Sequence, residues 1–259
     1  MEMSEFLAHI RKNILSIILF YKSFEEKQRQ PFNFISRADI INKMHHPYLK
    51  EENKLWKKAL KRVAGLDEAG RGPLAGPVMA AAVMVNAEKI GKCQNDFLQI
   101  LKEINDSKKL SPRKREKLYN LIVKCPAIEW GTGKVSEKVI DKINILQASK
   151  LAMEKAVNKI LKKQKKLDFL IIDGNFKINS PFPQKPIIKA DEKVFSCMAS
   201  SIIAKVSRDR IMVKLHKKYP HYGFHQHKGY PTKYHCKMLK KYKICSVHRK
   251  SFRPVSQMA

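Results

Sequence analysis

Residues 62–78, RVAGLDEAGRGPLAGPV, begin with an apolar run that stops at two adjacent acids and continues into a glycine-rich loop with an arginine. Residues 63–66 are predicted to form a short buried strand, because they are apolar and lie between basic residues and turn formers. Asp67 and Glu68 stand at the end of that strand, where two acids repel each other unless a cation neutralises them. Arg71 offers a planar set of donors that suits phosphate. The stretch predicts a metal–carboxylate site beside a phosphate-binding loop, with a pair of solvated turn acids as the alternative.

The charge balance predicts a polyanionic partner. The 259 residues include 53 Lys and Arg against 23 Asp and Glu, for a formal net charge of +30. Because each Lys or Arg that replaces a counterion on a phosphate backbone adds affinity, nucleic acid is the leading candidate. Attraction to a membrane surface is the alternative, but it requires a basic amphipathic helix or a lipidation motif, and neither is evident. We therefore expect no membrane association.

The cysteines favour a reducing compartment, and with it a cytoplasmic location. There are five, an odd number, and none forms a CxxC pair. Histidines gather near the C-terminus, so a zinc site that uses Cys236 and Cys245 is an alternative. The spacings match no structural zinc pattern, and we do not expect one.

Residues 1–45 are expected to form a short N-terminal extension of unknown role. The dense apolar run within residues 6–24 is too short to span a bilayer. Lys12 and Lys22 flank it and no small-residue cleavage site follows, so it is not typical of a signal peptide. We expect a helix that docks on the main domain.

From residue 62 onward, strands alternate with long helices, which is typical of an α/β layer structure. We expect strands at residues 63–66, 78–85, 128–135, 167–173 and 186–189. We expect helices at residues 48–59, 113–124, 145–161, 192–217 and 232–242, and a short one after Ser136. Ser111 followed by Pro112 is a typical helix start.

Two further acids follow predicted strands, as Asp67 does. Asp173 ends an apolar strand, and Asp191 lies just beyond the short strand after it. Functional groups gather at the carboxyl ends of strands in open α/β sheets, so four acids can meet there, with Glu68 as the fourth. Carboxylate oxygens select Mg²⁺ or Mn²⁺, and two such ions suit phosphodiester hydrolysis. The alternative is that Asp173 and Asp191 are helix caps or turn acids.

Several motifs, in the right order, resemble those of the type 2 ribonuclease H family. They are GRG with PLAGPV at residues 70–78, IDGN at 172–175, KADEKVFSCMASSIIAKVSRDR at 189–210, YPHYGFHQHKGYPT at 219–232 and HRKSF at 248–252. The related type 3 enzymes carry a different residue where Arg71 stands. The resemblance covers residues 47–255 approximately and implies a ribonuclease H-like mixed β-sheet flanked by helices, with a C-terminal helical segment. We expect one catalytic domain over residues 46–259.

The resemblance also implies the reaction and the residues that perform it. The implied catalytic and metal-binding acids are Asp67, Glu68, Asp173 and Asp191, which would hold two Mg²⁺ or Mn²⁺ ions. Asp209 is a rival fourth acid that we interpret as a member of a structural ion pair. The implied reaction is hydrolysis on the 5′ side of a ribonucleotide, in an RNA–DNA hybrid or embedded in duplex DNA, leaving 3′-OH and 5′-phosphate ends. We expect a monomer that acts in DNA replication and repair.

The implied substrate contacts lie in two loops. Gly70, Arg71 and Gly72, with Tyr230, are expected to sense a ribose 2′-OH, while the Tyr230 ring stacks on the sugar. The alternative for Tyr230 is a packed loop aromatic, and Tyr222 is expected to lie in the core. The basic residues expected to hold phosphates are Lys108, Lys109, Lys228 and His227, with a solvated basic face as the alternative.

Two departures from the family pattern lie near the third motif. Ala190 replaces a glycine that is usual in bacterial members, but it matches the archaeal form of the motif. The run from Phe195 to Met198 is bulkier than usual and predicts altered packing under the site. The rival to a nuclease is a basic nucleic-acid-binding protein whose acids are structural.

Overall fold

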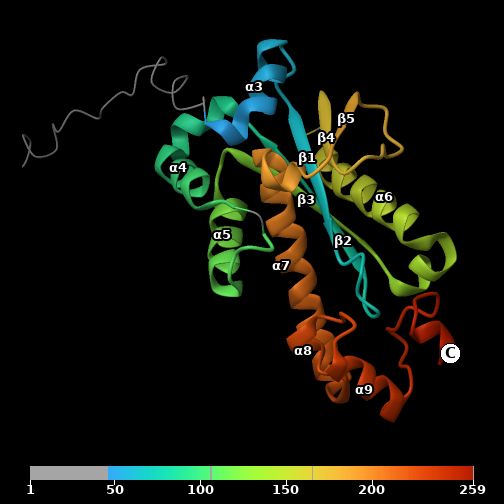
Figure 1. The fold of residues 1–259 in the computed structure, drawn as a ribbon. Helices are drawn as coiled ribbons and strands as arrows, with labels where there is room; N and C mark the ends of the chain where they lie inside the picture. The colour runs from blue at the N-terminus through green and yellow to red at the C-terminus, as the bar shows by residue number, and fades with distance from the viewer. Residues whose placement is uncertain (1–45, 106, 165, 259) are drawn as a thin grey trace, which may run out of the picture. The chain divides into compact units, whose positions relative to one another are not determined.

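Five strands form one mixed sheet in the order β3-β2-β1-β4-β5 (Figure 1). They are β1 (Val63–Ala69), β2 (Val78–Val85), β3 (Ile128–Val135), β4 (Phe169–Asp173) and β5 (Gln184–Ile187). Strand β2 pairs antiparallel with both β1 and β3, whereas β1, β4 and β5 run parallel to one another. Strand β2 is buried along its whole length, as its apolar sequence predicts. The predicted mixed sheet is confirmed.

This computed structural model describes residues 46–105, 107–164 and 166–258. All of them belong to the unit that runs from Met44 to Ala259. The expected N-terminal extension, with its helix within residues 6–24, lies outside the described residues. Among the described residues, no helix is long and apolar enough to cross a membrane.

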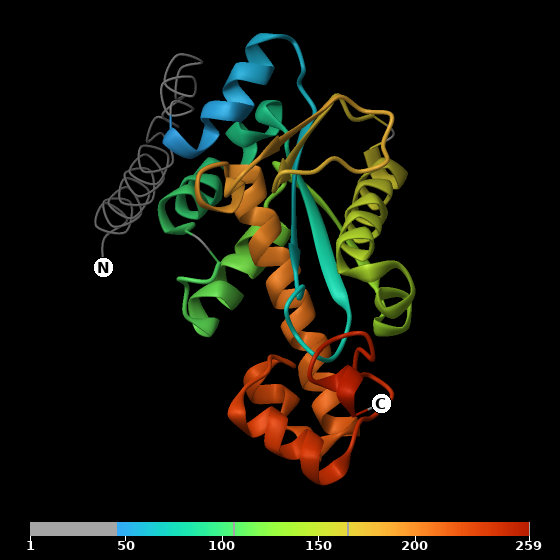
Figure 2. The ribbon, with the colours of Figure 1, turned by 45° about the vertical axis from the view of Figure 1, so that its right-hand side comes forward.

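Helices cover both faces of the sheet (Figures 1 and 2). On one face lie α3 (Lys50–Lys57), α4 (Gln94–Glu103), α5 (Pro112–Lys124) and α7 (Phe195–Lys218), and on the other lies α6 (Glu137–Gln164). Because successive side chains of a strand point to opposite faces, Val63 joins the α7 core while Ala64 and Leu66 join the α6 core. The flanking helices expected from the sequence are confirmed.

Helix α7 begins directly against β1. An added Cβ at Gly65 would lie 2.3 Å from Ser196 Oγ and 2.5 Å from the Cys197 backbone nitrogen. Ser200 Oγ donates to the Gly65 carbonyl at 2.6 Å. The bulkier run from Phe195 to Met198 is fully buried at this contact, so glycine at position 65 gives the room that the helix needs.

Element boundaries differ from the sequence expectations where tertiary pairing decides them. Strand β1 continues through Asp67 and Glu68 to Ala69, because β2 pairs with it over that whole length. Strand β5 lies two residues earlier than expected, and Lys189, with φ of 56°, turns the chain after it. A short 3₁₀ turn, η3 (Ala190–Glu192), precedes α7, which therefore begins at Phe195 rather than residue 192.

Helix α4 was not expected from the sequence. Helix α4 has no side-chain hydrogen bond at its N-cap, so the sequence lacks a start signal for it. The short helix expected after Ser136 and the long helix expected from residue 145 are confirmed. Both belong to α6, and they lie on either side of Asn144, whose φ of 65° and ψ of 168° are not helical.

The C-terminal part packs around the last turns of α7. It contains η4 (Pro220–Tyr222), α8 (Phe224–His227), α9 (Lys233–Tyr242) and η5 (Val255–Gln257). Met212 of α7, Tyr222, Phe224, Leu239 and Val255 form its core. Tyr222 is buried there, as expected. Figure 2 shows this part, in red, at the end of α7 that lies away from β5.

Glu52 of α3 is fully buried against the N-terminus of α7. Its Oε1 accepts hydrogen bonds from the backbone nitrogen of Ser196 at 2.8 Å and from Ser196 Oγ at 2.7 Å. Its Oε2 has no hydrogen-bond partner. Burial raises the pKa of Glu52 to about 7, because a buried carboxylate loses its hydration.

Glu52→Gln is expected to stabilise the protein more at high than at low pH. Because the folded-state pKa of Glu52 is raised from 4.5 to about 7, the wild type loses stability as the pH rises through that window. Glutamine cannot ionise, so the stability difference should grow by up to about 3 kcal/mol between about pH 5 and pH 8 in thermal unfolding. Glu51→Gln is the matched control, because ion pairs lower the pKa of Glu51. An equal difference at both pH values would contradict the prediction.

Candidate active site

Three aspartates meet at the carboxyl ends of the three parallel strands. Leu66 of β1 pairs with Ile172 of β4, so Asp67 and Asp173 are the next residues on adjacent strands. Asp173 in turn pairs with Ile187 of β5, and the chain reaches Asp191 in η3 shortly afterwards. One carboxylate oxygen from each aspartate lies within 4.8 Å of the others. The structure thus brings these three predicted acids together, and we call them the acidic triad.

The acidic triad concentrates negative charge in a poorly solvated place. Asp67 is only 5% exposed and Asp191 only 3%. Burial, followed by repulsion from Glu68 and Asp173, raises the pKa of Asp67 well above its usual range, although a hydrogen bond from Ser201 opposes the rise. Burial and then Asp191 raise the pKa of Asp173. Such a cluster is stable when it holds protons or cations.

Glu68 lies beside the acidic triad rather than within it. Its Oε1 accepts from Arg71 Nη1 at 3.2 Å, and its Oε2 is buried without a hydrogen-bond partner. Burial raises the pKa of Glu68, while Arg71 opposes the rise and Asp173 adds to it. Neighbouring residues of a strand point to opposite faces, which explains why Glu68 and Asp67 differ in position.

Lysines that were expected to hold phosphates lie in two different surroundings. Lys108 Nζ is 3.0 Å from Asp191 Oδ2, so this amine now contacts the acidic triad, and Lys109 is exposed in the same turn. Lys228 donates to the carbonyl of His225.

Asp209 pairs with Lys205 at 2.8 Å and with Arg115 at 3.8 Å, as expected of a structural acid.

Tyr230 and the glycine loop, residues 70–77, lie against each other. The space beside Gly72 is bounded by the Tyr230 ring, 3.7 Å from an added Cβ. The backbone nitrogen of Leu74 donates to the carbonyl of Gly229 at 2.8 Å, and the Tyr230 carbonyl accepts from His235 Nδ1 at 2.9 Å. The Tyr230 side chain remains exposed, with 42% of its surface accessible. The loop that follows the acids therefore carries an open aromatic face on one side.

The histidines of the C-terminal part have structural roles. Both ring nitrogens of His227 form hydrogen bonds with backbone atoms, of Tyr222 at 2.7 Å and of Gly229 at 3.1 Å, so both are already occupied. His235 Nε2 lies 3.1 Å from His248 Nε2, and His248 Nδ1 accepts from the backbone nitrogen of Cys245 at 2.9 Å. Burial lowers the pKa of His235 and His248 to about 4, so both rings are neutral near pH 7. Among the described residues, only the acidic triad groups potential metal ligands closely enough for one ion.

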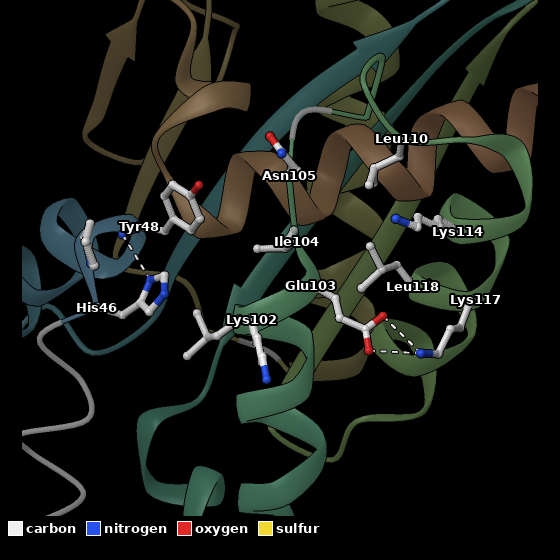
Figure 3. Close-up of a pocket in the computed structure, with 12 residues that line it drawn as sticks. His46, Tyr48, Lys102, Glu103, Ile104, Asn105, Leu110, Lys114, Lys117 and Leu118 are labelled. Carbon is white, nitrogen blue, oxygen red and sulfur yellow. Dashed lines mark hydrogen bonds and ion pairs between the residues drawn. The ribbon is translucent and has the colours of Figure 1, made fainter.

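A hollow of about 850 Å³ lies elsewhere, between η1 (Pro47–Leu49), α4 and α5 (Figure 3). Apolar side chains such as Leu110 and Leu118 line it together with Lys114, and Lys117 pairs with Glu103 at its edge. None of the acidic triad residues lines this hollow. It is therefore not the site at which the carboxylates gather.

Comparison with known proteins agrees with this geometry. A model of the family described as Ribonuclease HII matches residues 64–255. The chain belongs to the ribonuclease HII family. It is 44% identical over 249 residues to a ribonuclease HII of Bacillus thuringiensis (strain Al Hakam), covering 96% of this chain and 87% of that protein.

Solved structures with the same fold include archaeal members of the type 2 class. Ribonuclease H2 from Pyrococcus horikoshii OT3 superposes with a TM-score of 0.58 at 27% identity, covering 76% of this chain and 96% of that chain. The Archaeoglobus fulgidus RNase HII, solved in a complex with PCNA, gives a TM-score of 0.56 at 26% identity over 74% of this chain and 95% of that chain. The ribonuclease H-like fold implied by the sequence motifs is confirmed.

Membership of the ribonuclease HII family establishes the general chemistry. The protein is a metal-dependent endoribonuclease of the ribonuclease H type, and its family acts on RNA–DNA hybrids. The rival interpretation, a basic nucleic-acid-binding protein that is not a nuclease, is therefore wrong. The acidic triad is compatible with metal binding.

Sequence reasoning missed two residues that shape the site. Arg208 and Arg249 are fully buried, and both bond carbonyls of the glycine loop. Both lie inside motifs that the sequence analysis quoted, at residues 189–210 and 248–252. A charged residue inside such a motif was the available signal, but sequence alone does not reveal burial.

Asp173→Asn is expected to raise the melting temperature in the presence of a chelator, because it removes repulsion from the acidic triad. Added Mn²⁺ should raise the melting temperature of the wild type more than that of the variant, since a bound ligand stabilises the folded state. Asp168→Asn, at the residue just before β4, is the control and should leave the Mn²⁺ response unchanged. A variant that is destabilised in chelator and retains the full Mn²⁺ response would contradict the prediction.

Proposed function

We propose that this protein cuts the RNA strand of RNA–DNA hybrids and also cuts on the 5′ side of single ribonucleotides embedded in duplex DNA. The products are 3′-OH and 5′-phosphate ends. The observation that carries this proposal is the position of the acidic triad at the start of a loop that packs against Tyr230. Such an arrangement combines a place for cations with a surface that can recognise a sugar.

The acidic site fits a pair of divalent cations, and we propose Asp67, Glu68, Asp173 and Asp191 as their ligands. The donors are all carboxylate oxygens, which suit Mg²⁺ or Mn²⁺. Burial, with repulsion between carboxylates, raises the pKa of Asp67, Glu68 and Asp173, and Glu68 Oε2 is buried without a hydrogen-bond partner. Divalent ions bound here supply activation of a water and stabilisation of the leaving oxygen.

The remaining residues position the substrate. The guanidinium of Arg71 lies beside Glu68 and can bind a phosphate next to the acids. Lys108, paired with Asp191 at 3.0 Å, places a second positive charge at the same edge. Lys109, exposed in the same turn, and Lys228, in the turn before Tyr230, are proposed to extend this basic surface along the backbone.

Selection of a ribonucleotide is proposed to depend on the glycine loop and Tyr230. A 2′-OH distinguishes RNA from DNA at one position, and an exposed aromatic ring gives the neighbouring sugar a platform. Gly72 is exposed, and a Cβ added there would meet only the Tyr230 ring, so the loop backbone is open to such close approach at this point. We propose that the bound 2′-OH also helps to order the metal site, so an all-DNA duplex binds but is not cut.

The setting of the enzyme follows from its charge and its thiols. All five cysteines are free, which suits the reducing cytoplasm. The net charge of +30 suits a protein that searches nucleic acid. We propose a cytoplasmic monomer that acts in DNA replication and repair.

Asp67→Asn is expected to lower Mg²⁺-dependent cleavage of a duplex with one ribonucleotide by about a thousandfold or more, because a ligand carboxylate is lost. Duplex affinity should stay within about threefold, since the basic surface is intact. Asp209→Asn is the matched control, because that acid forms ion pairs away from the acidic triad. Retained cleavage by the Asp67→Asn variant would contradict the proposal.

Tyr230→Ala is expected to lower the cleavage rate at a single ribonucleotide about tenfold to a hundredfold, since a stacking platform is lost. Tyr234→Ala removes another exposed tyrosine four residues along and is the control. Rates for the two variants are compared on identical duplexes, with an all-DNA duplex as the uncut reference. Equal effects of both substitutions would argue against a specific role for Tyr230.

A further inference from the structure

Two arginines are the largest fully buried side chains among the described residues. Arg208 of α7 is 1% exposed and Arg249 of the C-terminal segment is 0% exposed. Neither forms an ion pair with a carboxylate in the part of the chain that the structure describes. Each guanidinium instead donates three hydrogen bonds to backbone carbonyls. Burying a charge is costly even when its donors form hydrogen bonds. The position of these two buried arginines therefore needs an explanation.

Arg249 holds both ends of the glycine loop. Its Nη2 donates to the Gly70 carbonyl at 2.6 Å, its Nη1 to the Arg71 carbonyl at 2.8 Å, and its Nε to the Gly76 carbonyl at 3.0 Å. The Arg249 backbone nitrogen also donates to the carbonyl of Leu74 at 2.8 Å. One residue, remote in sequence, thus fixes four carbonyls of the loop.

Arg208 joins the same loop to the turn that carries Tyr230. Its Nε donates to the Pro77 carbonyl at 3.0 Å and its Nη2 to the Ala75 carbonyl at 3.1 Å. Its Nη1 donates to the carbonyl of Lys228 at 2.9 Å. Arg208 therefore bridges two segments that are far apart in sequence and that both carry proposed substrate contacts.

The first glycine of the GRG motif makes room for this arrangement. Gly70 has a φ of +99°, and an added Cβ would lie 2.0 Å from Arg208 Nε. Any side chain at this position would displace the buried guanidinium, and the backbone conformation itself favours glycine. The motif is thus matched to a buried arginine as well as to a ligand.

The hydrogen bonds to Arg249 also fix where the loop amides point. In a trans peptide the carbonyl and the N–H of the same peptide plane point in opposite directions. Because the carbonyls of Gly70 and Arg71 point at Arg249, the N–H groups of Arg71 and Gly72 point away from it. Two donors of the GRG motif are therefore turned away from the buried arginine.

We propose that Arg208 and Arg249, the arginine pair, are positioning residues that hold the glycine loop and the Tyr230 turn in the geometry that discriminates ribonucleotides. This inference rests on the proposed function. The arginine pair touches no reacting atom and acts through the backbone that it fixes.

Charge and local anchoring support this role. Burial lowers the pKa of Arg249 to about 9 and of Arg208 to about 10, so both remain charged at neutral pH. They add positive potential behind a loop that meets an anionic substrate. Asp141 accepts hydrogen bonds from the backbone nitrogens of Lys250 at 3.0 Å and Ser251 at 2.9 Å, which anchors the segment beside Arg249.

Lysine is the informative substitution, because it keeps the charge but lacks the planar fork that reaches three carbonyls at once. The test compares Arg249→Lys and Arg208→Lys with Arg253→Lys, an exposed arginine four residues beyond Arg249. Hydrogen–deuterium exchange of residues 70–77 is measured without substrate. Steady-state kcat and KM are measured on a duplex with one ribonucleotide, and affinity is measured on the matched all-DNA duplex.

For both arginine-pair variants, we expect loop amides to exchange about tenfold faster or more, with exchange in β2 unchanged. The kcat at the single ribonucleotide should fall about tenfold or more, while KM and the all-DNA affinity stay within about twofold. Arg253→Lys should match the wild type in every measurement. A merely structural role would not separate kcat from affinity in this way.

Three results would overturn the proposal. Unchanged exchange in the loop would mean that the arginine pair does not hold it, and faster exchange with unchanged kcat would mean that the held geometry does not matter. Failure of both variants to fold at low temperature would assign the arginine pair to the whole fold rather than to the loop. If the wild type itself leaves the ribonucleotide duplex uncut, the proposed function fails, and the exchange data still report separately on the arginine pair.

Discussion

The parallel pairing of β1, β4 and β5 is the constraint on which the rest of the structure depends. Parallel strands end at the same edge of a sheet, so residues that follow them in sequence lie side by side. Here that edge receives Asp67, Asp173 and Asp191 from three strands. Strand β1 also pairs antiparallel with β2 as far as Ala69, and this second pairing carries the chain past the acids into the glycine loop. The acids and the glycine loop are adjacent because β1 carries Asp67 and leads directly into the loop.

Buried charges of opposite sign stand on either side of that loop. Within the acidic triad, burial and then repulsion from neighbouring carboxylates raise the pKa of Asp67 and of Asp173. The arginine pair has lowered pKa values because it is buried among carbonyls rather than carboxylates. In each case the fold buries ionisable groups that water would solvate better. Buried ionisable groups with shifted pKa values are common at functional sites. We propose that the loop between them contacts the substrate.

Local sequence signals predicted those parts of the fold that local physics decides. Residues 78–85 and 128–135 form the expected strands, and Ser111 Oγ accepts from the backbone nitrogen of Lys114, as its N-cap position predicts. Helix α4 was missed because Cys93 at its N-cap gives no such signal. The motifs predicted which acids converge, but sequence could not reveal that Glu68 lies beside the triad. Nor could it reveal that both ring nitrogens of His227 form hydrogen bonds with backbone atoms, since those partners are set by the folded structure.

The central claim is that the carboxylates of Asp67, Asp173 and Asp191 form one cation site. Anomalous diffraction from crystals soaked in Mn²⁺ tests it most directly, because it locates the ion without reference to activity. The account predicts anomalous peaks within coordination distance of oxygens from Asp67, Asp173 and Asp191. Peaks elsewhere on the protein, with none between these three carboxylates at saturating Mn²⁺, would contradict it.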